Sequence, residues 1–170
     1  MSNKKSWFVP AVLTFLGVSA ATAANPQCYT LASIQGSWAT VGTYGANVAL
    51  GFGQRYIDPN GVMTGVFVLN APTIGDTTGA RTVSSGTQAG TYTITCDGRG
   101  TVSRTTTSTL GIVVTTIDDF VITGAEVKNG KLIATAILDA QQTPSGLVPG
   151  GIFLFRNYTR LPDRPGPTQP

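Results

Sequence analysis

The sequence predicts an all-β fold: a single antiparallel up-and-down β-barrel of about eight strands, with a β-sandwich as the alternative. Two observations lead to this prediction. Threonine, valine, isoleucine and aromatic residues, which favour strands, are frequent, and no stretch keeps a helical period over three turns. Turn-forming residues also recur at short intervals between segments in which apolar residues alternate.

The first 23 residues have the three parts of a cleavable secretory signal peptide. Lys4 and Lys5 form a positive n-region, an apolar run follows over 7–18, and small residues lead to a cleavage site after Ala23. The apolar run is shorter than the roughly 20 residues that a membrane-spanning helix needs. We therefore expect a secreted or periplasmic protein with no membrane span after cleavage.

Removal of this leader changes the charge of the chain. The full sequence has 11 basic and 8 acidic residues. Without Lys4 and Lys5, nine basic residues remain against eight acidic ones, and the net charge is +1. The remaining basic residues are scattered singly, without the stripe or run that binds nucleic acid. The sequence therefore argues against nucleic acid as a partner.

The rest of the chain is expected to form one domain over 24–161, followed by a disordered proline-rich tail over 162–170. The domain is long enough for one hydrophobic core and too short for two. Cys28 and Cys96 are expected to form a disulfide, because thiols usually oxidise outside the cytoplasm. Such a bond would stabilise the domain by roughly 4 kcal/mol. Two free thiols are the alternative.

Three hairpin turns define the order of the strands. The segments 58–61, 97–100 and 129–130 contain Asp-Gly or Asn-Gly type turn residues, and each is flanked by alternating apolar residues. A helical turn is expected over 29–34, and a longer loop rich in Gly, Thr and Ser over 71–87. The expected strands cover 36–44, 48–57, 62–70, 90–96, 101–108, 112–123, 131–140 and 151–160.

Alternation along these strands predicts which side chains share a face. The candidate ligand-binding residues in the lumen are aromatic side chains, as walls, and polar ones, which would orient a ligand: Tyr44, Phe52, Gln54, Tyr56, Tyr92, Arg104 and Asp119. An inward Arg104 would need a carboxylate partner, because an unpaired buried charge is costly. The alternative is that Arg104 lies on the outer face in water. Asp118 and Asp119 are adjacent in a strand, so they point to opposite faces and cannot form a catalytic pair.

The composition excludes several kinds of catalytic and metal site, because the chain has no histidine. His-dependent triads and the usual zinc sites are excluded, and no dinucleotide or phosphate-binding glycine motif is present. Asp58 and Asn60 are similar to the opening of a calcium loop, but Pro59 interrupts it and a hairpin turn explains these residues. We expect no metal and no cofactor.

Gly36, Ser37 and Trp38 on the first strand resemble the Gly-X-Trp signature of the calycin barrels, the lipocalin and avidin group. In that group the last strand often supplies an arginine that packs over the tryptophan. The resemblance implies this structural role for Trp38 and for Arg156, with Arg160 as the other candidate. An ordinary core position is the alternative for Trp38. The rest of the chain looks like small secreted bacterial barrels, which implies a fold without an activity.

Three functions stay open, and the sequence favours binding over catalysis. The first is an exported barrel that binds a small, mostly apolar ligand in its lumen. The second is a cofactor-independent cyclase or isomerase of the allene-oxide-cyclase or dirigent type, which needs an inward carboxylate or arginine in an open pocket. The third is a structural or interaction protein of the envelope or extracellular matrix, with a filled barrel and homo-oligomer contacts. The proline-rich tail and the expected disulfide disfavour an outer-membrane barrel.

Overall fold

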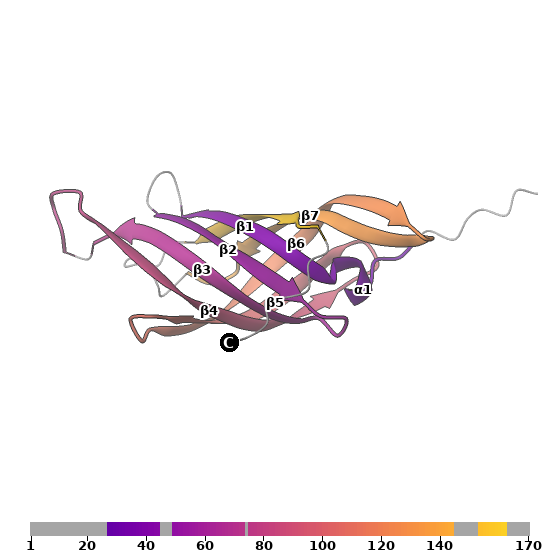
Figure 1. The fold of residues 1–170 in the computed structure, drawn as a ribbon, viewed down its shortest axis with the longest axis horizontal. Coiled ribbons are helices and arrows are strands. Elements are labelled where there is room, and N and C mark those ends of the chain that lie inside the picture. Colours follow the sequence, from indigo (N-terminus) through magenta and orange to yellow (C-terminus); the bar gives the residue numbers. More distant parts are fainter. Residues whose placement is uncertain (1–26, 45–48, 74, 145–152, 163–170) are drawn as a thin grey trace, which may run out of the picture.

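The computed structural model describes residues 27–44, 49–73, 75–144 and 153–162. Within these ranges the chain forms one short helix, α1 (Leu31–Ile34), and eight strands that close into a barrel (Figure 1). The expected signal peptide over 1–23 and nearly all of the expected tail lie outside the described residues. The strands are β1 (Gly36–Tyr44), β2 (Ala49–Ile57), β3 (Val62–Pro72), β4 (Arg81–Ile94), β5 (Arg99–Ser108), β6 (Val113–Lys128), β7 (Lys131–Gln141) and β8 (Leu154–Arg160).

Each strand pairs antiparallel with the next one along the chain, and β8 returns to pair with β1. In this closing pair Trp38 lies opposite Arg160, and Tyr44 lies opposite Leu154. Closure removes the two edges that an open sheet would expose. The predicted up-and-down barrel is confirmed, and the alternative of a sandwich is wrong.

The alternating strand directions give the barrel two distinct ends. We call the end that carries α1 and the turns β2–β3, β4–β5 and β6–β7 the helix end (Figure 1). The opposite end, which carries the β3–β4 and β5–β6 connections, is the loop end. No helix among the described residues is long and apolar enough to cross a membrane.

The three predicted hairpin turns all lie at the helix end. In the β2–β3 turn, the carboxylate of Asp58 accepts hydrogen bonds from the backbone N–H groups of Asn60 and Val62, both at 2.8 Å. Between β6 and β7, Asn129 and Gly130 have φ angles of 53° and 74°. This left-handed pair is the geometry of a type I′ turn, which an Asn-Gly sequence adopts readily.

The predicted loop over 71–87 is wrong for most of its length. β3 continues to Pro72, β4 begins at Arg81, and the connection between them is 73–80. Val83 pairs with Asn70 in this extension of the sheet. Glycine, serine and threonine look like loop residues in a sequence, but each has a backbone N–H and C=O that a neighbouring strand can pair.

The inner face of the barrel has an apolar part and a polar part. Toward the helix end lies the main core cluster, which includes Trp38, Ile57 and Val102, all fully buried. A smaller apolar cluster, which includes Leu69 and Leu154, lies toward the loop end. Inward positions between the two clusters are polar or charged.

Candidate functional site

Five charged side chains cross the inside of the barrel between the two apolar clusters, and we call them the charged layer. On each strand the charged residue lies two positions from an apolar residue of the main core, so strand alternation turns both inward. Each of the five is at most 3% exposed. The members are Arg55 on β2, Arg104 on β5, Asp118 on β6, Asp139 on β7 and Arg156 on β8.

Asp118 links two of the arginines. Its Oδ2 lies 3.1 Å from Arg104 Nε and 2.6 Å from Arg156 Nη2. Arg104 also donates from Nη1 to Thr106 Oγ1 at 2.7 Å. Arg156 Nε donates to Asp139 Oδ1 at 2.7 Å, so this guanidinium contacts both carboxylates of the layer. Such pairing offsets the cost of removing these charges from water.

Arg55 has a different set of partners. Its Nε donates to Gln88 Oε1 at 2.9 Å, and its Nη1 donates to the hydroxyl of Tyr158. That hydroxyl in turn donates to Asp139. Arg55 Nη1 itself lies 3.9 Å from Asp139 Oδ2. The hydrogen bonds of Arg55 therefore go to neutral groups.

Burial and neighbouring charges set the protonation of the layer. Burial disfavours the charged form of Asp118, but Arg156 and Arg104 more than offset this, and the pKa of the carboxyl lies below 3.8. Burial raises the pKa of Tyr158 well above 10, so its hydroxyl keeps its proton at neutral pH. Burial, followed by the positive charges of Arg156 and Arg55, lowers the pKa of Arg104.

A pocket opens beside the charged layer. Its cavity volume is about 30 Å³, and the empty space including its open mouth is about 380 Å³. A single water molecule needs roughly 10–15 Å³ by the first measure, so the pocket has room for a small chemical group. The lining residues are Thr40, Gly42, Gly51, Phe52, Arg55, Phe67, Val68, Leu69, Gln88, Arg104, Leu154 and Arg156.

Gly42 on β1 leaves the space that the side chain of Arg156 needs in the charged layer. A Cβ on Gly42 would lie 2.6 Å from Arg156 Cγ and 3.0 Å from Leu154 Cδ1. At Gly51 on β2, by contrast, a Cβ would meet its nearest atoms, in Leu69 and Val68, at 3.7 Å. A Cβ at Gly51 would therefore make ordinary van der Waals contacts in the pocket wall, whereas Gly42 is required by the packing of Arg156.

Two buried hydroxyl groups and part of one guanidinium lack hydrogen-bond partners among the described residues. Arg156 Nη1, Tyr92 Oη and Thr116 Oγ1 are in this state. Buried polar groups almost always have partners. Of the three residues, Arg156 lines the pocket.

Two of the predicted lumen residues do face inward. Tyr92 is 4% exposed and packs edge-on against Phe120 in the main core. Arg104 is buried and has the carboxylate partner that an inward arginine needs, namely Asp118. The alternative of a solvent-exposed Arg104 is wrong. Tyr44 ends β1, and its side chain lies outside what the structure describes.

The inward placement of the other four predicted lumen residues is wrong. Phe52 is 57% exposed, Gln54 is exposed and Tyr56 is half-buried, because on β2 the inward residues are Arg55 and Ile57. A shift of one residue in strand phase exchanges the two faces. The sequence favoured the aromatic face as the inner one, whereas the barrel turns the arginine inward.

Asp119 also lies on the outer face, where its side chain is exposed and accepts a hydrogen bond from Gln142 Nε2 at 2.8 Å. Its neighbour Asp118 follows the inward phase of Phe120 and is fully buried. Sequence reasoning therefore missed most of the charged layer. The signal that could have found it is an ionisable residue two positions from an apolar residue, repeated with both signs of charge on five strands.

Trp38 has the structural role that was expected, but its partner is Arg160 rather than Arg156. Trp38 is fully buried, and its Nε1 donates to the backbone oxygen of Ile34 at 2.9 Å. The guanidinium of Arg160 lies 4.7 Å from the centre of the ring. The strand register explains this, because Arg160 lies directly opposite Trp38, whereas Arg156 lies opposite Gly42 and belongs to the charged layer.

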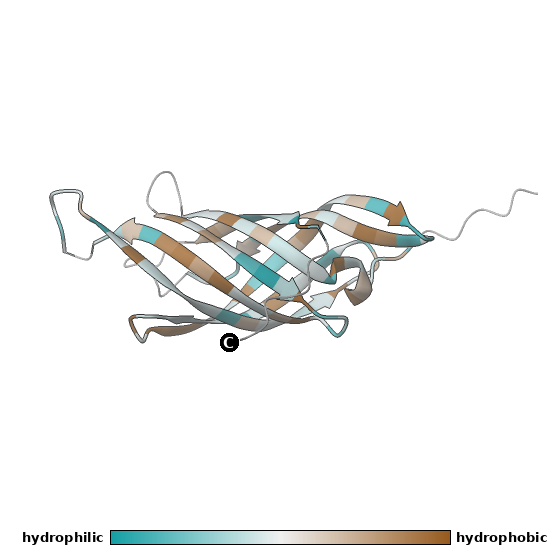
Figure 2. Ribbon diagram, in the orientation of Figure 1, coloured by the Kyte–Doolittle hydropathy of each residue, from teal (hydrophilic) through white to brown (hydrophobic). Residues whose placement is uncertain are grey.

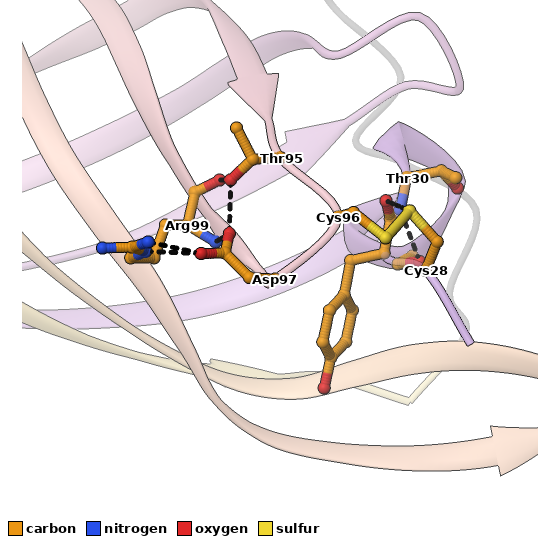
Figure 3. Close-up of a disulfide and its surroundings, with 8 residues drawn as sticks. Cys28, Thr30, Thr95, Cys96, Asp97 and Arg99 are labelled. Carbon is orange, nitrogen blue, oxygen red and sulfur yellow. Dashed lines mark hydrogen bonds and ion pairs between the residues drawn. A yellow bond between two sulfur atoms is a disulfide. The ribbon is translucent and has the colours of Figure 1, made fainter. Parts of the chain in front are cut away.

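The predicted disulfide between Cys28 and Cys96 is confirmed (Figure 3). The backbone N–H of Tyr29 also donates to Cys96 O at 3.2 Å, so the segment before α1 is fixed to the β4–β5 turn. In that turn Asp97 accepts hydrogen bonds from Thr95 and Arg99, which lower its pKa to about 2. These contacts hold the segment before α1 against the helix end of the barrel.

The described residues contain no cluster of three or more Asp, Glu or Cys side chains that could hold a metal ion. The charged layer presents guanidinium groups, with Gln88 and Tyr158 as neutral hydrogen-bonding partners of Arg55. No protein-family model, curated protein or solved structure matches this chain.

Proposed function

We propose that this chain is an exported β-barrel that binds a small, mostly apolar molecule in its lumen. The pocket beside the charged layer is the observation that carries the proposal. It combines apolar walls from Phe67, Leu69 and Leu154 with a few convergent polar groups, which is the usual composition of a ligand site. The features of the leader and the disulfide both support export to an oxidising compartment.

The two parts of the pocket have different roles in this proposal. The arginines and Gln88 give a ligand its orientation, because buried hydrogen-bond donors reject groups that cannot accept from them. Phe67 and the leucines cover the apolar part of the ligand, and each Å² of apolar surface removed from water contributes roughly 25 cal/mol. The polar end of the ligand lies against the arginines, and its apolar part lies against Phe67 and the leucines.

Native mass spectrometry of the protein purified from its own source tests the proposal. We expect a small molecule bound in a one-to-one ratio. The matched variant is Gly51→Leu, because a Cβ fits at this position of the pocket wall without a clash and the larger side chain fills the pocket while the charged layer stays in place. It should lose the bound molecule. A wild-type protein free of any small molecule and equally unable to take one up would refute the proposal.

The outer face of the barrel supports a second candidate, an interaction protein. Val41 and Phe52 lie directly opposite each other on β1 and β2 and are 47% and 57% exposed, and Val66 on β3 is 54% exposed. Strongly hydrophobic segments are visible on these strands in Figure 2. Contiguous apolar surface on a barrel wall is typical of subunit contacts. Light scattering after size exclusion should then give an oligomer that Phe52→Ser converts to a monomer.

A further inference from the structure

The charged layer contains one more cation than it has carboxylates. Three guanidinium groups, which stay protonated in proteins, face two aspartates. Among the described residues that are buried, Asp118 and Asp139 are the acidic ones. Tyr158 does not supply the missing negative charge, because burial holds its pKa well above 10. An excess charge inside a barrel is costly unless something neutralises it.

Of the three arginines, Arg55 has the longest contact with a carboxylate, 3.9 Å from its Nη1 to Asp139 Oδ2. Asp118 pairs with Arg104 and Arg156, and Asp139 accepts from Arg156 and Tyr158. Both carboxylates are thus engaged by other groups. Arg55 is the arginine whose hydrogen bonds all go to neutral acceptors, Gln88 and Tyr158.

A second observation concerns Arg156. Its Nη1 is buried, and it has no hydrogen-bond partner among the described residues. A charged donor left in this state is rare in folded proteins. The layer therefore has one excess positive charge and, on Arg156, an unused donor.

The pocket is lined by these arginines and not by the aspartates. Arg55, Arg104 and Arg156 all line it, whereas Asp118 and Asp139 are absent from its lining. A molecule that enters the pocket therefore meets arginine side chains rather than aspartates. It meets apolar side chains, such as Phe67 and Leu154, around them.

We infer that the ligand is a small organic acid, and that its carboxylate binds Arg55 and Arg156 while its apolar body lies against Phe67 and the leucines of the mouth. A carboxylate supplies the missing negative charge and accepts from a guanidinium through two parallel hydrogen bonds. A carboxylate has three heavy atoms, and a pocket with a cavity volume of about 30 Å³ has room for a group of this size. The inference rests on the proposed function, because it names the class of molecule that the same pocket takes.

The test is a calorimetric titration of the mature full-length protein, freed of bound small molecules, with three probes. Hexanoate has a carboxylate and an apolar chain, hexan-1-ol has the same chain without the charge, and inorganic phosphate has the charge without the chain. We expect hexanoate to bind one-to-one and at least tenfold more tightly than either of the other probes.

Three variants locate the site. Arg55→Gln should weaken hexanoate binding at least tenfold and leave hexan-1-ol binding nearly unchanged. This variant removes only the 3.9 Å contact with Asp139 and leaves the shorter pairs of Arg104 and Arg156 with the aspartates intact, so it is the arginine change most compatible with folding. Gly51→Leu should abolish hexanoate binding because it fills the pocket, although the charged layer is unchanged. Arg99→Gln is the matched control, because it removes one positive charge from an exposed pair at the helix end.

The outcomes separate this inference from the proposed function. Equal affinity for hexanoate and hexan-1-ol would refute recognition of a carboxylate, but it would agree with ligand binding in the lumen. Tighter binding of phosphate than of hexanoate would also overturn it. Failure of both hexanoate and hexan-1-ol to bind would refute the proposed function as well. These three comparisons use the wild-type protein, so they decide the question even if Arg55→Gln does not fold.

Discussion

Asp118→Asn should strongly destabilise the folded chain. Among substitutions that keep the size and shape of the side chain, we expect it to be one of the most destabilising. The substitution keeps the size of the side chain and removes one negative charge from a site that is 0% exposed. The charged layer would then have three guanidinium groups and one carboxylate.

The magnitude follows from the two ion pairs of Asp118. At an effective dielectric constant of about 20, opposite charges at 3.1 Å and 2.6 Å attract by roughly 5–6 kcal/mol each. Part of this lost attraction is offset, because the neutral side chain of asparagine does not pay the desolvation cost of a buried carboxylate, which is several kcal/mol. Removal of one partner from a buried ion pair usually costs 3–5 kcal/mol, and we expect a loss of about that size in the free energy of unfolding.

Urea denaturation followed by circular dichroism measures this loss. The control is Asp97→Asn, which breaks the exposed pair with Arg99 and should leave the midpoint nearly unchanged. A destabilisation by Asp118→Asn of less than about 1 kcal/mol, with an unchanged denaturant slope, would refute the reasoning, because it would mean that the buried charges contribute no more than surface pairs.

Three further predictions concern pH, the buried tryptophan and the disulfide. The pKa of Asp118 is lowered in the folded state, so the unfolded chain takes up the proton first as the pH falls. The stability of the wild-type protein should therefore fall as the pH drops below 3.8. Denaturation midpoints should show a shallower loss in Asp118→Asn. Trp38→Phe should cost about 1–3 kcal/mol in a thermal melt, because the carbonyl of Ile34 loses its donor. Cys28→Ala with Cys96→Ala should cost roughly 2–5 kcal/mol, and hydrogen exchange should show loss of protection at the Tyr29 amide, which bonds to Cys96.

Local rules account for the parts of the fold that were predicted correctly. An Asn-Gly pair such as Asn129-Gly130 readily adopts the two left-handed conformations of its turn. The carboxylate of Asp58 accepts a hydrogen bond from the backbone N–H of Asn60 within the β2–β3 turn. The barrel itself followed from the number of strands and the short turns between them. The start of β4 was missed because backbone pairing depends on the neighbouring strand, and Ser84 pairs with Leu69 across the sheet whatever its own preference.

The candidate site was predicted only in part. Tyr92 and Arg104 were placed in the lumen correctly, and the need of Arg104 for a carboxylate was met by Asp118. Phe52 and Asp119 were placed on the wrong face. Periodicity shows that alternate residues share a face, but it does not show which face is inside when both carry apolar groups.

What the sequence determined by itself is the all-β class, the hairpin turns and the disulfide partners, whereas an arginine packed on Trp38 was an implication of the resemblance to calycin barrels. The tertiary structure alone decided that Arg55, Asp139 and Arg156 would turn inward together. Their pairing spans β2, β7 and β8, strands that closure of the barrel holds around one lumen. Burial of each charge is favourable only when the others are present, and this mutual dependence is a property of the closed barrel that no single strand carries.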